Sequence, residues 1–141
     1  MVTIRVAAAD GKDGMSILEH LLPYGDSPPL HIHRTQDEVF HVLEGEIRVK
    51  LGEQEKRFGR GDTFVAPKGV PHTYRVESKT GGRFLTVTLG DDFERLVRAF
   101  GRPAQRPGLP DPAGPPSPEA IQALSKSAAL CGIDLVGPPL Q

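Results

Sequence analysis

Short runs of alternating apolar and polar residues fill most of residues 4–89, and this pattern constrains the fold more than any other feature. In residues 46–51, Ile47, Val49 and Leu51 share one face of an extended strand, and charged residues share the other. Glycine, proline and aspartate interrupt the runs, which is typical of strands joined by tight turns. The other runs that we interpret as strands are residues 3–7, 15–22, 38–43, 56–58, 63–66, 73–76 and 84–89. So many short strands predict an all-β fold, either a closed barrel or a double-sheet barrel.

Beyond this segment the chain changes to a helical pattern and then to a proline-rich one. Residues 91–100 carry apolar side chains at helical spacing, which predicts a short helix. These side chains are Phe93, Leu96, Val97 and Phe100. Half of the 14 prolines lie within residues 103–118, so that stretch is neither regular helix nor central strand. We interpret it as an extended connection.

A second helix is predicted after the connection. Ser117 is suited to the N-cap, Pro118 to the first helical position, and Gly132 to the end of the helix. The predicted buried stripe of this helix consists of Ile121, Leu124 and Ala128. Cys131 is expected to be a small buried contact on the same helix. Residues 133–136 are expected to form a last extended piece.

The chain length fits a single globular domain, because 141 residues are enough to bury a core. We expect residues 1–92 to form the barrel core, with residues 93–141 as a helical extension that packs on it. The 17 basic residues nearly balance the 18 acidic ones, so no broad basic field favours nucleic acid or an anionic membrane. The lone cysteine, the absence of a long apolar stretch and the N-terminal sequence indicate a cytoplasmic protein rather than a secreted or membrane protein.

Three histidines and one glutamate stand at spacings that favour one metal site. His31 and His33 are two residues apart, so on an extended strand both imidazoles point to the same side. Glu38 follows a polar stretch that can turn the chain back beside them, and His72 follows a turn rich in glycine and proline. Three imidazoles and a carboxylate suit Fe, Mn, Co, Ni, Cu or Zn better than Ca or Mg. We predict one divalent transition metal per chain; the alternative is four ordinary surface or core side chains.

The other two histidines are expected to be structural. His41 lies three residues after Glu38, so strand alternation turns it to the opposite side, away from the ion. His20 shares its face with Leu18 and Leu22 and could face the cavity. We nevertheless predict a structural role for it, with its hydrogen bonds satisfied inside the protein.

The same alternation predicts the wall of a cavity around the metal. Four residues share the face of a predicted ligand on their own strand, namely Phe40, Val42, Tyr74 and Val76. We expect a mostly apolar pocket in which Tyr74 offers a hydroxyl group for hydrogen bonding, although ordinary barrel core would use the same positions. The candidate catalytic residues are Glu38, which could exchange a proton with a substrate, and Tyr74.

The spacing of these residues resembles the two sequence motifs of the cupin superfamily. The first motif is matched by Gly25, His31, His33, Glu38 and Gly45, and the second by Gly61, Pro67, Gly69 and His72. This resemblance implies a double-stranded β-helix, or jelly-roll, barrel that holds a divalent metal through the three histidines and Glu38. Val76 stands where the second motif often has asparagine, which implies a different substrate end.

The C-terminal part looks like small single-domain cupins of the quercetin-dioxygenase-like type. It shares with them a proline-rich crossover, a short helix and a closing Gly-Pro-Pro sequence. The resemblance also favours a homodimer. Strand residues 3–7 could add to a partner's sheet edge, because an uncovered edge invites pairing.

Three functions are compatible with the sequence. Four protein ligands on an ion that prefers six leave two positions for a bidentate substrate or dioxygen. The first hypothesis is a metal-dependent dioxygenase acting on a small oxygen-rich molecule. The second is an isomerase, lyase or decarboxylase in which the metal is only a Lewis acid. The third is a non-catalytic module that binds a small ligand.

Overall fold

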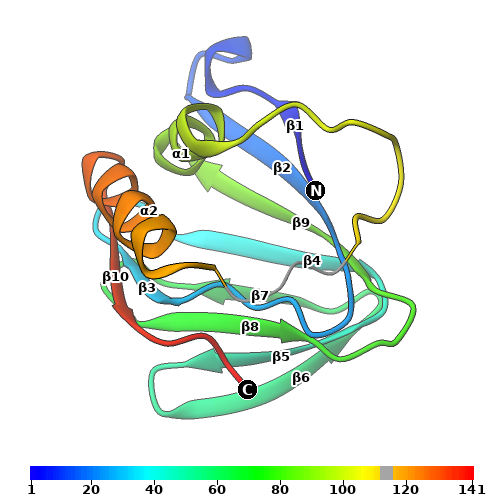
Figure 1. Cartoon of the computed structure of the whole chain (residues 1–141). Helices are drawn as coiled ribbons and strands as arrows, with labels where there is room; N and C mark the ends of the chain where they lie inside the picture. Colours follow the sequence, from blue (N-terminus) through cyan, green and yellow to red (C-terminus); the bar gives the residue numbers. More distant parts are fainter. Residues whose placement is uncertain (112–115) are drawn as a thin grey trace.

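The computed structural model describes residues 1–111 and 116–141. Its strands form two antiparallel sheets of five strands each, which enclose a common core (Figure 1). This arrangement confirms the predicted all-β jelly-roll barrel. Part of the predicted proline-rich connection, residues 112–115, lies outside the described residues.

Each sheet combines strands that are distant in the sequence. The first sheet has the order β1 (Val2–Val6), β2 (Met15–Leu22), β9 (Gly82–Leu89), β4 (Glu38–Glu44) and β7 (Thr63–Ala66). The second has the order β10 (Ile133–Gly137), β3 (Leu30–His33), β8 (His72–Val76), β5 (Glu46–Leu51) and β6 (Gln54–Gly59). A short 3-10 helix, η1 (Ala8–Asp10), follows β1. The predicted strands match these bounds to within two residues.

Alternating side chains from both sheets build the main core. On β2, for example, Leu18, His20 and Leu22 are buried while their neighbours are half-buried, as period-two alternation requires. The buried apolar residues of the core cluster are Leu22, Phe40, Val42, Ile47, Val49, Ala66, Tyr74, Val76 and Phe84. Burying this apolar surface between the sheets fixes their register, because a slip by one residue would expose every side chain of a strand.

Gly45 makes the tight turn between β4 and β5. Its φ is +80°, which favours glycine, and a Cβ atom there would lie 2.6 Å from the carbonyl oxygen of Gly81. The glycine that ends the first motif is therefore required by the backbone conformation and by the close approach of a neighbouring segment.

Two helices cover one end of the barrel (Figure 1). Helix α1 (Asp92–Phe100) follows β9, and α2 (Pro118–Leu130) precedes β10. The hydroxyl oxygen of Ser117 accepts a hydrogen bond from the N–H of Ala120 over 3.2 Å, which confirms the predicted N-cap. Gly132, with φ of +76°, follows the last turn as predicted.

The helices and β10 share a second, smaller core. Its buried members are Leu96, Ala128, Cys131 and Ile133, with Phe93, Leu124 and Leu135 packed against them. Ile121 does not join this core: it is 45% exposed, so its predicted burial is wrong. The helix contacts the barrel only through its later turns, and helical periodicity does not reveal where that contact begins.

The C-terminal segment also completes a sheet. Strand β10 pairs antiparallel with β3, so residues distant from the barrel core in sequence form the edge of the second sheet. The predicted domain division at residue 92 remains a prediction. Within the part of the chain that the structure covers, no helix combines the length and apolar character needed to cross a membrane.

Candidate metal centre

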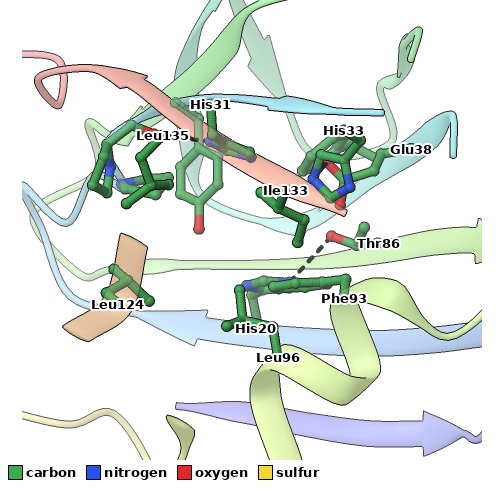
Figure 2. A pocket seen from close by; sticks show the side chains of 14 residues that line it. His20, His31, His33, Glu38, Thr86, Phe93, Leu96, Leu124, Ile133 and Leu135 are labelled. Carbon is green, nitrogen blue, oxygen red and sulfur yellow. Dashed lines mark hydrogen bonds and ion pairs between the residues drawn. The ribbon is translucent and has the colours of Figure 1, made fainter. Parts of the chain in front are cut away.

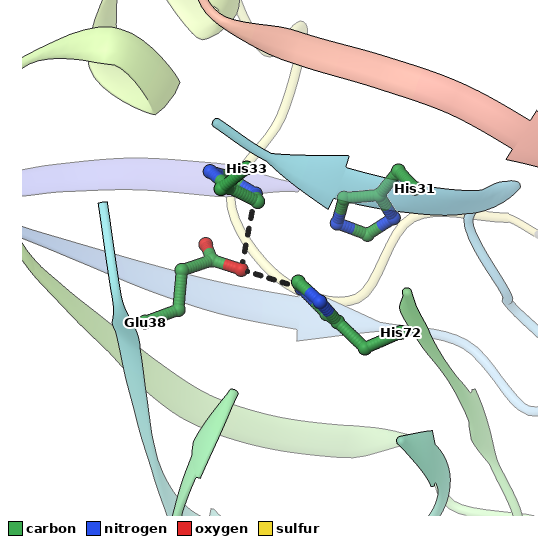
Figure 3. A group of neighbouring side chains, drawn as sticks. All are labelled: His31, His33, Glu38 and His72. Carbon is green, nitrogen blue, oxygen red and sulfur yellow. Dashed lines mark hydrogen bonds and ion pairs between the residues drawn. The ribbon is translucent and has the colours of Figure 1, made fainter. Parts of the chain in front are cut away.

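His31, His33, Glu38 and His72 converge on one point between the two sheets (Figure 3). One donor atom from each side chain lies within 4.8 Å of the donor atoms of the other three. A transition metal ion binds imidazole nitrogen and carboxylate oxygen at about 2 Å, so four donors this close can share one ion. The fold thus brings together all four predicted ligands.

Backbone pairing explains the convergence. His31 and His33 lie on β3, and His72 on β8 stands directly opposite His31 in the antiparallel register. Glu38 begins β4 in the other sheet, where it pairs with Thr88 of β9. The imidazoles therefore come from one sheet and the carboxylate from the other, so the cluster forms only when the two sheets close on each other.

Hydrogen bonds to the backbone orient two of the imidazoles. Nδ1 of His31 lies 2.8 Å from the carbonyl oxygen of Pro29, and Nδ1 of His72 lies 3.0 Å from that of Val70. A carbonyl oxygen only accepts hydrogen bonds, so Nδ1 is the donor in both rings. The neutral form of each ring then has an unprotonated Nε2, and neutral imidazole with its other nitrogen held by a hydrogen bond is the usual metal ligand.

The contacts of Glu38 require a positive charge at this point. Its Oε2 atom lies 2.9 Å from Nε2 of His72 and 3.1 Å from Nε2 of His33. With His72 neutral, the contact would place two lone pairs against each other, so a proton or a metal cation has to lie between these atoms. Nitrogen and carboxylate donors around one point are the set that a divalent transition metal prefers, and the residues therefore fit such an ion.

Burial and charge set the protonation of the ligands. Burial, followed by the charge of His72, lowers the pKa of His31 to about 4. Burial opposes protonation of His72, but its hydrogen bond to Glu38 and the charge of that carboxylate leave the pKa of His72 above its ordinary value. Burial would raise the pKa of Glu38, but the imidazoles of His33 and His72 hold it well below its usual range. Glu38 is thus ionised at neutral pH, as a ligand must be.

His33 differs from the other two imidazoles. Its Nδ1 is buried and has no hydrogen-bond partner among the described residues. Aromatic neighbours hold the ring instead: the centroid of His72 lies 5.5 Å away in a stacked arrangement and that of Phe93 lies 6.4 Å away edge-on. Aromatic packing, together with the contact of Nε2 with Glu38, therefore orients this imidazole.

A cavity of about 170 Å³ lies beside the cluster. Figure 2 shows His31, His33 and Glu38 on one side of it, and His20 and Thr86 on the opposite side. The remaining lining residues are largely apolar: Pro28, Pro29, Phe40, Tyr74, Phe93, Leu96, Leu124, Ile133 and Leu135. The cavity therefore has polar groups at two ends and an apolar wall between them.

The structure separates the four predicted pocket residues into two pairs. Phe40 and Tyr74 line the cavity. Val42 and Val76 do not: each is 0% exposed and belongs to the main core cluster, so their predicted place in the pocket is corrected. Both lie two residues further along their strands, about 7 Å beyond the cavity wall. Strand alternation predicts on which face of a strand a side chain lies, but not how far along the strand the cavity extends.

Tyr74 can act as a hydrogen-bond donor. Burial, with the charges of Asp26 and Glu38, raises the pKa of Tyr74 well above its usual value. Its hydroxyl group therefore stays protonated at neutral pH. The Tyr74 side chain lines the cavity, and no hydrogen bond of its hydroxyl group is found within residues 1–111 and 116–141.

Several cavity residues were not predicted from the sequence. Ile133 pairs opposite His33, and Leu135 pairs opposite His31, so β10 places both beside the ligands. Phe93 and Leu124 reach the cavity from α1 and α2. The helical spacing of these apolar residues indicated burial, but no local signal indicated that they close a cavity.

The two remaining histidines occupy different surroundings. His41 lies outside the cluster, as predicted, and its Nδ1 is 2.8 Å from Oγ1 of Thr63. His20 faces the cavity, and its Nε2 is 3.1 Å from Oγ1 of Thr86. The ring of His20 stacks on Phe84 at a centroid distance of 4.6 Å.

Fold and site together define the class of this protein: a two-sheet β-barrel with three histidines and one glutamate converging at a cavity in its interior. The sequence profile of the cupin domain family matches residues 18–88, about half of the chain, and this range includes all four converging residues. The chain belongs to the cupin family.

Individual relatives extend this result. Quercetin 2,3-dioxygenase of Bacillus subtilis (strain 168) is 32% identical over 79 residues, which cover 56% of this chain and 23% of that enzyme. The chain thus spans less than a quarter of that enzyme's length. Among solved structures, TT1209 from Thermus thermophilus is 31% identical with a TM-score of 0.53, covering 62% of this chain and 84% of that one. The polyketide cyclase RemF from Streptomyces resistomycificus is 26% identical with a TM-score of 0.55, covering 62% of each chain.

Proposed function

We propose that this cupin is a metal-dependent dioxygenase of the quercetin-dioxygenase-like type, acting on a small oxygen-rich organic molecule. The observation that carries the proposal is the convergence of His31, His33, Glu38 and His72, whose donor atoms all lie within 4.8 Å of one another, at the edge of a mostly apolar cavity. The 32% identity to the Bacillus subtilis quercetin 2,3-dioxygenase supports the reaction class.

The four converging residues would hold one divalent ion per chain, chosen from Fe, Mn, Ni, Co, Cu and Zn. A bound ion of this kind supplies a Lewis acid and, if it is redox-active, a path for electrons between substrate and dioxygen. His31 and His72 keep Nε2 for that ion because Nδ1 of each donates to a backbone carbonyl group.

Two side chains are proposed to act on the substrate. Oε2 of Glu38 contacts the imidazoles of His33 and His72, and its other oxygen takes no part in these two contacts (Figure 3). That ionised carboxylate can accept a proton from an acidic substrate hydroxyl. Tyr74 keeps its proton and can donate a hydrogen bond to a substrate oxygen.

The cavity limits the substrate to a small molecule. Its volume of about 170 Å³ is below the roughly 300–1,000 Å³ of sites that take drug-sized ligands. Apolar residues such as Ile133 and Leu135 exclude water from the body of the substrate, which strengthens polar contacts at its ends. A single substituted ring or an enediol of similar size fits this description.

Oxygen uptake tests the proposal. The full chain, reconstituted separately with each of the six metals, is mixed with catechols, enediols and flavonols in an oxygen electrode. We expect one substrate class to consume oxygen with at least one metal, and His33→Ala and Glu38→Gln to abolish uptake while His41→Ala retains it. Substrate turnover that continues at full rate without oxygen would refute the dioxygenase reaction.

A non-redox reaction is the second candidate, and the likeness to the polyketide cyclase RemF is the observation that supports it. In that case the metal-loaded protein converts its substrate under nitrogen as fast as in air. A ligand recovered chemically unchanged from the protein would instead support the third hypothesis, a non-catalytic binding module.

We also propose a homodimer formed through strand β1. This strand lies at the edge of the first sheet, where its outer hydrogen-bonding groups are available for a second strand. Sedimentation at micromolar concentration should give a dimer, and a monomer alone would contradict the proposal. The cytoplasmic location inferred from composition remains a prediction.

A further inference from the structure

His20 is a buried histidine that the proposed metal centre does not use. It lies on β2, in the sheet that supplies Glu38, and lines the side of the cavity opposite His31 and His33 (Figure 2). The rings of Phe84 and Phe93 lie parallel to it at centroid distances of 4.6 and 5.6 Å. Its ring is therefore held in one orientation by aromatic packing.

A hydrogen bond to Thr86 engages one ring nitrogen of His20, Nε2. Nε2 lies 3.1 Å from Oγ1 of Thr86, and this is the hydroxyl group's one hydrogen bond within the described residues. Either group can be the donor in this contact, because the Thr86 hydroxyl also lines the cavity. In the tautomer in which Thr86 donates to Nε2, Nδ1 carries the hydrogen of the neutral ring.

The Nδ1–H group of His20 is left available. It has no hydrogen-bond partner among the described residues, and it is not enclosed like Nδ1 of His33, which is buried without a partner. His20 lines two hollows, the cavity beside the metal centre and a second one that Val2, Asp26 and Val97 also line. A donor at this position leaves a polar group unsatisfied unless water or a ligand accepts from it.

We propose that His20 is a substrate-positioning residue whose Nδ1–H donates to an acceptor oxygen at the end of the substrate distant from the metal. The cavity then selects small molecules with two neighbouring oxygens at one end, an apolar body, and a carbonyl-type or nitro-type oxygen at the other end. The two neighbouring oxygens at the metal end of this ligand rest on the proposed function. The acceptor oxygen at the His20 end does not.

The far end of such a ligand is uncharged. Burial lowers the pKa of His20 to about 4, although the charge of Glu38 acts in the opposite direction, so the ring is neutral at neutral pH. A carboxylate placed against a neutral imidazole and the apolar residues Phe93 and Leu96 would lose its hydration without gaining an opposite charge. A neutral acceptor oxygen loses much less.

A matched pair of probes tests the proposal. 4-Nitrocatechol and 4-isopropylcatechol share the neighbouring oxygens and have substituents of similar shape, but only the nitro group accepts hydrogen bonds. Both are titrated calorimetrically into the zinc-reconstituted full chain. The measured quantity is the ratio of the two dissociation constants, in which the different acidities of the probes cancel when variants are compared.

Three variants complete the experiment. His20→Phe keeps a flat ring beside Phe84 and Phe93 and removes both nitrogens, and it should reduce the preference for 4-nitrocatechol about 10-fold, as loss of one neutral hydrogen bond predicts. His20→Asn keeps an amide donor near the position of Nδ1 and should retain most of the preference. His41→Phe makes the same exchange outside the cavity and should leave the ratio unchanged.

The outcomes separate this inference from the proposed function. An unchanged ratio in His20→Phe, or no binding of either probe to the wild-type chain at millimolar concentration, overturns the role of His20. If removal of zinc leaves both affinities unchanged while His20→Phe still lowers the ratio, the proposed metal function fails and the role of His20 stands.

Discussion

The backbone N–H of Gly69 donates to the carbonyl oxygen of His33 over 2.8 Å. This bond ties the turn before β8, which delivers His72, to the strand that carries the other two imidazoles. Gly69 has a φ of +78°, a conformation that favours glycine. The conformation of one turn residue thus contributes to the spacing between ligands from the two sequence motifs.

Replacing Gly69 with alanine should lower the free energy of unfolding by about 1–2 kcal/mol, because an L-residue is strained in this region. An added Cβ atom would meet nothing within 4 Å, so backbone strain is the main expected cause. Urea unfolding measures the change. Gly11→Ala is the matched control, since its Cβ atom also meets nothing within 4 Å but its φ is −122°. Equal losses in the two variants would contradict the prediction.

Val42 is assigned to the core rather than to the cavity wall, and this can be tested. Val42→Ala should lower the free energy of unfolding by about 2 kcal/mol, from the loss of two buried methyl groups. It should leave the affinity for 4-nitrocatechol unchanged, which calorimetry measures. Val65→Ala is the control, because Val65 is 47% exposed and its change in stability should stay within about 0.5 kcal/mol. A loss of probe affinity in Val42→Ala would return this residue to the cavity wall.

His20 makes stability depend on pH. Burial lowers its pKa from 6.5 to about 4, so between these values the unfolded chain binds a proton at this residue and the folded chain does not. Acidification in this window therefore favours unfolding, and stability is lost as the pH falls from 6.5 towards 4. His20→Phe should reduce that loss by up to about 3 kcal/mol.

Urea unfolding of the wild type and His20→Phe at several pH values measures this effect. As the pH falls from 6.5 to 4, the unfolding free energy of His20→Phe should decrease less than that of the wild type. A difference that stays constant from pH 6.5 to 4 would show that His20 titrates in the same way in both states.

The four converging residues could be selected from the sequence because their spacing carries local signals, although their convergence also depends on the closure of the two sheets. His31 and His33 share a face by strand alternation alone, and the turns before Glu38 and His72 are marked by polar residues, glycine and proline. The strand bounds follow from the same alternation. Where neighbouring residues in the chain determine the local structure, the sequence pattern is sufficient to predict that structure.

What the sequence did not reveal depends on contacts between distant segments. Val42 and Val76 have the correct face, but only the packed barrel shows that they lie beyond the cavity. Ile121 has the correct helical spacing, yet the helix meets the barrel only at later turns. Ile133 and Leu135 became cavity residues through the pairing of β10 with β3, a register that no local pattern encodes.

For the polar residue His20, the sequence pattern likewise did not reveal contacts with distant segments. The prediction that it could face the cavity is confirmed, but a satisfied structural role was expected for it. The bond to Thr86, located 66 residues away in the chain, satisfies only Nε2. The available donor becomes visible only when the cavity and its opposite wall are known together.

The most direct test of the metal centre is elemental analysis of the purified, untagged protein after reconstitution with each candidate metal. We predict about one ion per chain in the wild type and in His41→Ala, and a sharp loss in His33→Ala and Glu38→Ala, with circular dichroism showing that the barrel remains folded. Full occupancy in the His33 and Glu38 variants, or no bound metal in the wild type, would contradict a metal held by His31, His33, Glu38 and His72.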